Sequence, residues 1–153
     1  MSPTPVSLKG RALRLLSQRD HTRAELIRKL GPLEEAEGDL ARVLDELTAK
    51  GFISEDRVIE SHLNRRASKL GVARLRQELI DKGVSAAAMQ AALQGLAHSE
   101  AERAQEVWAR KFGQSSGDPK EKARQMRFLL ARGFSAAVVR RVLDQAQSRS
   151  PGE

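Results

Sequence analysis

The sequence predicts an all-α protein, an elongated tandem array of three three-helix repeats built from helix-turn-helix-like units. Three observations predict it. Apolar residues recur three or four positions apart along nearly the whole 153-residue chain, which is the helical period. Gly–apolar–Ser segments separate these stripes. The segment KGVSAAAMQAAL, which starts at Lys82, recurs as RGFSAAVVRRVL from Arg132, and a period near 50 residues is typical of units stacked in a line.

The apolar stripes predict nine helices. They lie at about residues 8–16, 26–30, 36–47, 59–70, 72–79, 86–96, 101–112, 123–130 and 139–146. Grouped in threes, they give units at 8–53, 54–97 and 98–147, between flexible ends at 1–7 and 148–153. The first unit is the most diverged, as is common for a terminal repeat. The positions expected to be buried and equivalent are Leu79, Leu93, Leu129 and Leu143.

The connections carry helix stop and start signals. Gly83 and Gly133 are expected to end helices in the left-handed conformation, and the apolar residue after each folds back on the last turn. Ser85 and Ser135 then accept backbone N–H bonds as N-caps of the next helix. Gly51–Ser54 is the same device with one extra residue. Further start signals are a capping box of Thr22 with Glu25, and Asp118 followed by Pro119.

Charge is graded along the chain, whose net charge is +7. Residues 1–56 carry 9 Lys and Arg against 10 Asp and Glu, residues 57–100 carry 7 against 4, and residues 101–153 carry 11 against 6. This gradient predicts a polyanionic partner for the C-terminal part. Aromatic residues are only 3% of the chain, which argues against a base-stacking platform.

The composition also bounds the compartment and the chemistry. There is no Cys, which fits a reducing cytosol. No apolar run is long enough to span a membrane, and the N-terminus lacks the apolar core of a signal peptide. We therefore expect a cytoplasmic protein without a membrane segment. His21, His62 and His98 lie in different units, and no spacing of metal ligands or phosphate-binding loop occurs. The sequence therefore predicts a non-enzymatic protein without catalytic residues, metal or cofactor.

The candidate binding residues are cations of the third and second units. At 100° per residue, Lys120, Arg124 and Arg127 share one helix face, and none has an acidic residue at i+4. The alternative is an ordinary solvated face. Arg140 and Arg141 are expected to extend this surface, although Asp144 can pair with Arg140. Further candidates in the second unit are Arg65, Arg66 and Arg74; for Arg66 the favoured interpretation is structural, with its head group on a neighbouring unit's carboxylate.

Four segments resemble the successive signatures of the RecX family, bacterial regulatory proteins that modulate the RecA recombinase. They are HTRAELIRKL (His21–Leu30), VLDELTAKGFISEDR (Val43–Arg57), LGVARLRQELIDKGVS (Leu70–Ser85) and MRFLLARGFS (Met126–Ser135). Two departures from the family pattern are Gly71-Val72, usually Gly-Pro, and Val58-Ile59, where Phe-Ala is common.

The resemblance implies an all-helical regulator that binds RecA and its filament on single-stranded DNA. It implies inhibition of filament growth, ATP hydrolysis, strand exchange and coprotease activity, and so a role in DNA repair, recombination and the SOS response. We expect a monomer. A weak direct contact with DNA stays open. The alternatives are a basic helix-turn-helix-type module that acts directly on nucleic acid, and a structural adaptor for an acidic protein.

Overall fold

The computed structural model describes residues 6–149, and within that range the protein is entirely helical, without a strand. This confirms the all-α prediction. The described residues form nine α-helices and one short 3₁₀ turn: α1 Leu8–Gln18, α2 Arg23–Leu30, η1 Gly31–Leu33, α3 Asp39–Ala49, α4 Glu55–Arg66, α5 Val72–Asp81, α6 Ala86–Ala97, α7 Glu100–Lys111, α8 Pro119–Ala131 and α9 Ala136–Arg149. The predicted flexible ends lie mostly outside the described residues; Ser7 caps α1, and α9 reaches Arg149.

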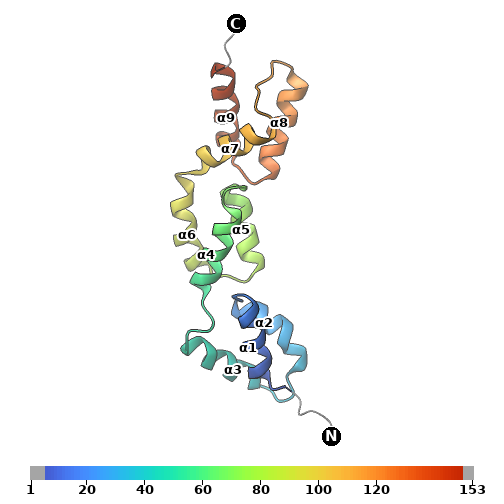
Figure 1. Cartoon of the computed structure of the whole chain (residues 1–153), viewed down its shortest axis with the longest axis vertical. Coiled ribbons are helices and arrows are strands. Elements are labelled where there is room, and N and C mark those ends of the chain that lie inside the picture. Colours follow the sequence, from blue (N-terminus) through green and yellow to red (C-terminus); the bar gives the residue numbers. More distant parts are fainter. Residues whose placement is uncertain (1–5, 150–153) are drawn as a thin grey trace.

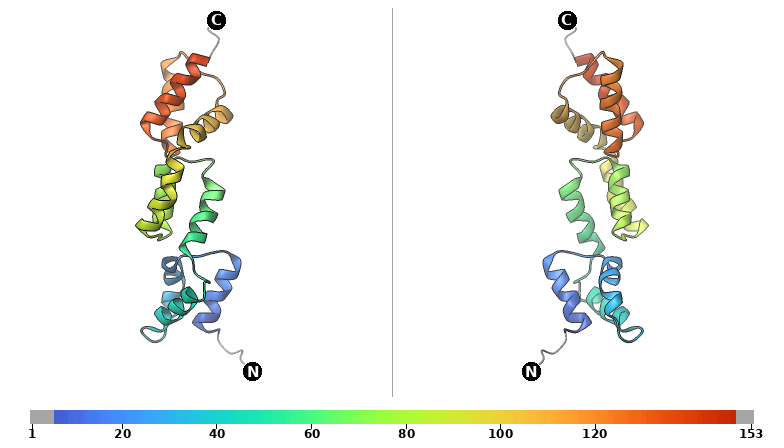
Figure 2. Two further views of the ribbon diagram at one scale, coloured as in Figure 1. Left: turned by 90° about the vertical axis from the view of Figure 1, so that its left-hand side faces the viewer. Right: turned by 90° about the vertical axis from the view of Figure 1, so that its right-hand side faces the viewer.

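The helices form three groups placed one after another along the molecule, with α1 and α9 at opposite ends (Figures 1 and 2). Each group of three consecutive helices encloses its own hydrophobic core rather than sharing one. The four leucines expected at equivalent positions are all buried, at 0, 2, 0 and 4% exposure for Leu79, Leu93, Leu129 and Leu143. Four residues assigned to the apolar stripes are instead exposed: Ile27, Ala36, Ala86 and Leu130.

The Gly–apolar–Ser corners have the predicted geometry. Gly83 and Gly133 adopt φ angles of 85° and 92°, which side chains disfavour. The amide of the residue after each glycine forms a hydrogen bond with a carbonyl in the last turn of the helix. Val84 N donates to the Leu79 carbonyl, and Phe134 N donates to the Leu129 carbonyl. The hydroxyls of Ser85 and Ser135 accept amides of the following helices. The capping box of Thr22 with Glu25 and the Asp118 cap are also confirmed.

The repeated corner has a second role, which is to join one unit to the next. In both junctions the corner between the second and third helices of a unit packs on the N-terminus of the second helix of the unit before. Gly71 N donates to the carbonyl of Arg132 at 2.9 Å, and the hydroxyl of Thr22 donates to the carbonyl of Lys82. Lys82 and Arg132 are the matching positions of the repeated segment, so the recurrence of that segment corresponds to recurrence of the junction.

Glycine is needed at these junctions because the two backbones meet without side chains between them. A Cβ atom added at Gly83 would overlap the Cβ of Ala24. One added at Gly133 would overlap the Cβ of Arg74 and would lie 2.6 Å from the Arg74 amide nitrogen. Since real Cβ atoms do not approach other heavy atoms so closely, any side chain there must push the units apart.

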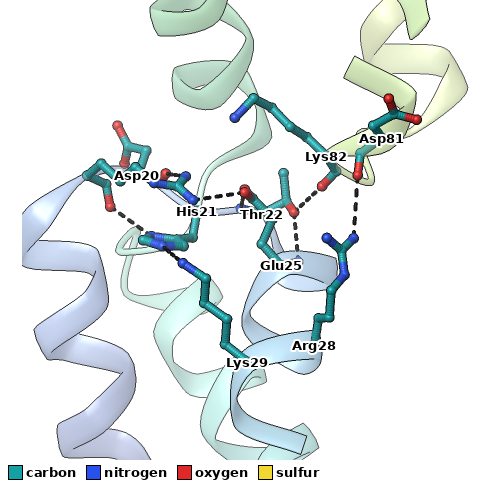
Figure 3. A network of polar contacts seen from close by, with 9 residues as sticks. Asp20, His21, Thr22, Glu25, Arg28, Lys29, Asp81 and Lys82 are labelled. Atoms are coloured by element: carbon teal, nitrogen blue, oxygen red, sulfur yellow. Dashed lines mark hydrogen bonds and ion pairs between the residues drawn. The ribbon is translucent and has the colours of Figure 1, made fainter. Parts of the chain in front are cut away.

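The first junction is held by a polar network around the start of α2 (Figure 3). The Arg28 guanidinium reaches the carbonyl of Asp81 in the next unit at 3.4 Å. His21 is almost fully buried beneath the junction, with Nδ1 at 3.0 Å from the Arg19 carbonyl and Nε2 at 3.1 Å from Lys29 Nζ. Burial is the main cause that lowers the pKa of His21.

The second junction contains a buried arginine. Arg103 of α7 is 8% exposed, and its guanidinium donates to the carbonyls of Ala67, Leu70 and Leu96, all in the preceding unit. Burial lowers the pKa of Arg103. The five donors of a guanidinium let one side chain satisfy several carbonyls at the ends of α4 and α6. Arg103 therefore connects the second core to the third.

We expect small-angle scattering to show an extended particle. A compact globule of this length would have a radius of gyration of roughly 15 Å. Three cores in a line with two narrow junctions predict a value above about 18 Å in dilute solution. A value near 15 Å would mean that the units fold back on one another in solution.

Candidate interaction surface

The basic residues predicted on α8 lie on the solvent side of the third unit. Asp118 caps the helix, its carboxylate accepting the amide of Lys120 at 3.1 Å. Leu129 turns into the core, whereas Lys120, Arg124 and Arg127 are exposed. This arrangement follows from the helical period, which separates the apolar and basic positions of α8 onto different faces.

The three cations are not equally free, which corrects the prediction of an unpaired stripe. Arg124 forms two hydrogen bonds with the carboxylate of Glu121, at 2.9 and 3.0 Å. This pair raises the pKa of Arg124 and lowers that of Glu121. Glu121 stands three residues before Arg124, a spacing that also brings two side chains together on a helix, so the absence of an acidic residue at i+4 does not leave Arg124 unpaired. Lys120 and Arg127 form no ion pair within residues 6–149.

Two phenylalanines, Phe112 at the end of α7 and Phe128 within α8, bring further cations to this region. The rings of Phe112 and Phe128 meet edge to face with centroids 5.4 Å apart. Arg124 lies over the Phe112 ring at 5.2 Å, and two more cations, Lys111 and Arg132, lie over Phe128 at 5.3 and 4.9 Å. Such contacts hold cations at the surface without neutralising them. Sequence reasoning missed Lys111 and Arg132. Lys111 reaches Phe128 because α7 packs on α8, whereas Arg132 follows Phe128 by four residues, a helical spacing that offered a local signal.

Arg140 and Arg141 are exposed on the solvent side of α9, opposite the buried Val139, Val142 and Leu143. The ion pair considered between Arg140 and Asp144 is not formed among the described residues. A polar contact does join α8 to α9: the ammonium of Lys122 on α8 donates to the side-chain amide oxygen of Gln147 on α9 at 3.5 Å. Both arginines thus stay available to a partner.

The second-unit candidates are largely committed to internal contacts. Glu78 of α5 accepts hydrogen bonds from Arg66 at 2.6 and 3.1 Å and lies 3.5 Å from Arg74. It also contacts His62 Nε2 at 2.8 Å. The Arg66 contact is the main cause that lowers the pKa of Glu78, while burial lowers the pKa of His62. The expectation that Arg66 binds a carboxylate is correct, but that carboxylate belongs to its own unit, not to a neighbour.

Arg74 and Arg65 differ in their surroundings. Arg74 also donates to the carbonyl of Ala131 at 3.4 Å, so it supports the second junction. Arg65 is exposed and donates only to the Ser61 carbonyl one turn earlier in α4. Four candidates therefore have neither a carboxylate nor a carbonyl partner for their charged groups in the described part of the chain: Lys120, Arg127, Arg140 and Arg141.

Two other kinds of structural feature are absent from the described residues. Residues 6–149 contain no group of three or more His, Cys, Asp or Glu side chains arranged to hold a metal ion. Over the same range, no helix has both the length and the apolar character needed to cross a membrane.

Family models match two parts of the chain. Residues 9–47 match the model described as RecX, first three-helix domain, and residues 99–143 match RecX, third three-helix domain. The matched ranges correspond to α1–α3 and α7–α9, the first and last of the three helix groups.

Whole-length relatives carry the same family name. The chain is 54% identical to "Regulatory protein RecX" of Leptothrix cholodnii, over 90% of this chain and 88% of the relative. It is 45% identical to "Regulatory protein RecX" of Ralstonia nicotianae, over 94% of this chain and 91% of the relative.

Solved structures share the fold. A crystal structure of RecX from Lactobacillus salivarius matches with a TM-score of 0.76 at 20% identity, covering 92% of this chain and 95% of that one. A second crystal structure, of a regulatory protein RecX, matches with the same TM-score at 22% identity, covering 90% of this chain and 71% of that one.

Proposed function

Because this chain belongs to the RecX family of regulatory proteins, we propose that it binds RecA and the RecA filament on single-stranded DNA and limits RecA activity. The inhibited steps are filament growth, ATP hydrolysis, strand exchange and coprotease activity, so the protein modulates recombination, DNA repair and the SOS response. It acts as a non-enzymatic monomer in the cytoplasm. The observation that carries this proposal is the 54% identity, along nearly the whole length of both chains, to a protein named "Regulatory protein RecX".

The charges of the third unit support a polyanionic or acidic binding partner. Four cations, Lys120, Arg127, Arg140 and Arg141, are exposed and form no ion pair with another residue of the described range 6–149. Exposed cations of this kind accelerate association with a negatively charged surface more than they tighten the final complex. The DNA of a nucleoprotein filament offers such a surface, and an acidic patch on RecA would offer one as well. Arg65, Arg66 and Arg74 remain secondary candidates, since the last two already hold Glu78.

The direct test measures ATP hydrolysis by RecA on single-stranded DNA with and without this protein. We expect the rate to fall as the protein is added, because binding that limits filament growth leaves fewer active RecA protomers. The protein alone, with DNA and ATP, should hydrolyse nothing above background. An unchanged RecA rate at saturating protein, or ATP hydrolysis by the protein itself, would contradict the proposal.

A direct action on nucleic acid is the second candidate, and the free cations of α8 and α9 favour it. The two functions differ in salt dependence and in the need for RecA. Affinity that comes from phosphate contacts falls steeply with salt, in proportion to the number of contacts. Binding to single-stranded DNA without RecA, as tight as binding to the filament and equally salt-sensitive, would favour the nucleic-acid module.

A further inference from the structure

The second unit carries a groove whose chemistry is opposite to that of the third unit. It lies between α4 and α6, which pack against each other on one side of that unit (Figure 1), and has a volume of about 460 Å³. Its floor is apolar, with Ile59 buried and Leu63 half-buried. Its α6 wall consists of alanines only: Ala88, Ala91 and Ala92.

The α4 edge of the groove is acidic. Asp56, Glu60 and Asn64 lie one turn apart along it and are exposed. Neither carboxylate forms an ion pair or hydrogen bond within residues 6–149. Two unneutralised carboxylates therefore stand beside an apolar floor, in a chain whose net charge is +7. Their charges repel nucleic acid and attract cationic side chains.

The groove is fixed in shape by a contact at one end. Glu55, the first residue of α4, accepts hydrogen bonds from the Ser85 amide at 2.8 Å and the Ser85 hydroxyl at 2.9 Å. The N-termini of α4 and α6 are thereby held together. A groove whose walls are already placed costs little ordering when a partner binds.

We propose that the α4–α6 groove binds a polypeptide segment of RecA that presents an aliphatic side chain next to Lys or Arg. The aliphatic group fills the space over Ile59 and Leu63, and the cation pairs with Asp56 and Glu60. The alanine wall lets a helix approach α6 closely, as in other helix-in-groove complexes. The inference rests on the proposed function and deepens it: the basic third unit meets negative charge, whereas this groove contacts protein.

Two variants test the groove independently. Ala91→Trp fills it from the exposed wall, and the double variant Asp56→Lys, Glu60→Lys reverses its edge. The matched controls are Gln90→Trp, on the opposite side of α6, and Glu35→Lys with Glu37→Lys, two exposed carboxylates of the first unit that form no ion pair or hydrogen bond within residues 6–149. Helical circular dichroism and melting temperature identify any variant that fails to fold, in which case the other variant decides.

The readout is the dissociation constant for RecA without DNA, measured by fluorescence anisotropy, beside that for a single-stranded oligonucleotide without RecA. We expect both groove variants to bind RecA at least about tenfold more weakly than their controls. Their affinity for the oligonucleotide should stay the same or, for the charge reversal, rise.

Three other results overturn the inference. If the groove variants bind RecA as well as their controls while the wild-type protein inhibits RecA, the groove does not contribute to RecA binding and the proposed function stands. If they lose oligonucleotide binding and keep RecA binding, the occupant is nucleic acid. If wild-type protein binds no RecA at all, the proposed function fails and the groove's assigned partner with it.

Discussion

Gly133→Ala is expected to destabilise the protein by about 2–5 kcal/mol. The backbone of Gly133 has a φ of 92°, a left-handed conformation that costs a residue with a Cβ atom roughly 1–2 kcal/mol. The added methyl would also overlap Arg74 at the start of α5, and overpacking against backbone costs a further 1–3 kcal/mol or so. Urea unfolding followed by circular dichroism measures the loss.

Other glycines of the chain separate the two causes. Gly71→Ala meets the carbonyl group of Gly133 without a left-handed backbone, so we expect a loss of about 1–3 kcal/mol from the collision alone. Gly51→Ala has the left-handed backbone, with φ of 83°, and open space, so strain alone should cost about 1–2 kcal/mol. If Gly133→Ala costs no more than Gly51→Ala, the junction is not as tight as described.

Reversal of the free charges on α8 should weaken inhibition of RecA by about tenfold or more at low salt. The variant is Lys120→Glu with Arg127→Glu, because these two cations have no ion pair to lose within residues 6–149. Arg124 is left in place, since its removal would also release Glu121 and uncover the Phe112 ring. The measurement is the protein concentration that halves RecA's ATP hydrolysis on single-stranded DNA.

The loss should come from slower association and should shrink at high salt, where exposed charges are screened. The matched control reverses Arg14 and Lys69, two exposed cations on other units, and so makes the same change in net charge. Folding should hardly change in either variant, because exposed substitutions usually alter stability by about 0.5 kcal/mol or less. Equal inhibition by both variants at low salt would show that the α8 cations are an ordinary solvated surface.

The sequence by itself determined the features that depend on residues close together in the chain. The apolar period gave nine helices, and the glycine and serine of KGVS and RGFS marked where helices end and begin, because stop and cap signals act over three to five residues. The burial of Leu79 and Leu129 followed from the same period. The positions of the α8 cations followed as well, since a helix face is fixed by spacing alone.

Tertiary structure decided which charged residues have internal partners, and it gave the repeated Gly–apolar–Ser corner its role in joining one unit to the next. Glu78 contacts Arg66 and His62 only because α4 packs on α5, and Arg103 reaches three carbonyls only because α7 docks on the second unit. From the local sequence alone, the glycine at the repeated corner predicts only the end of a helix. Its contact with a helix about 60 residues earlier depends on how two units meet, and no local pattern encodes that distance.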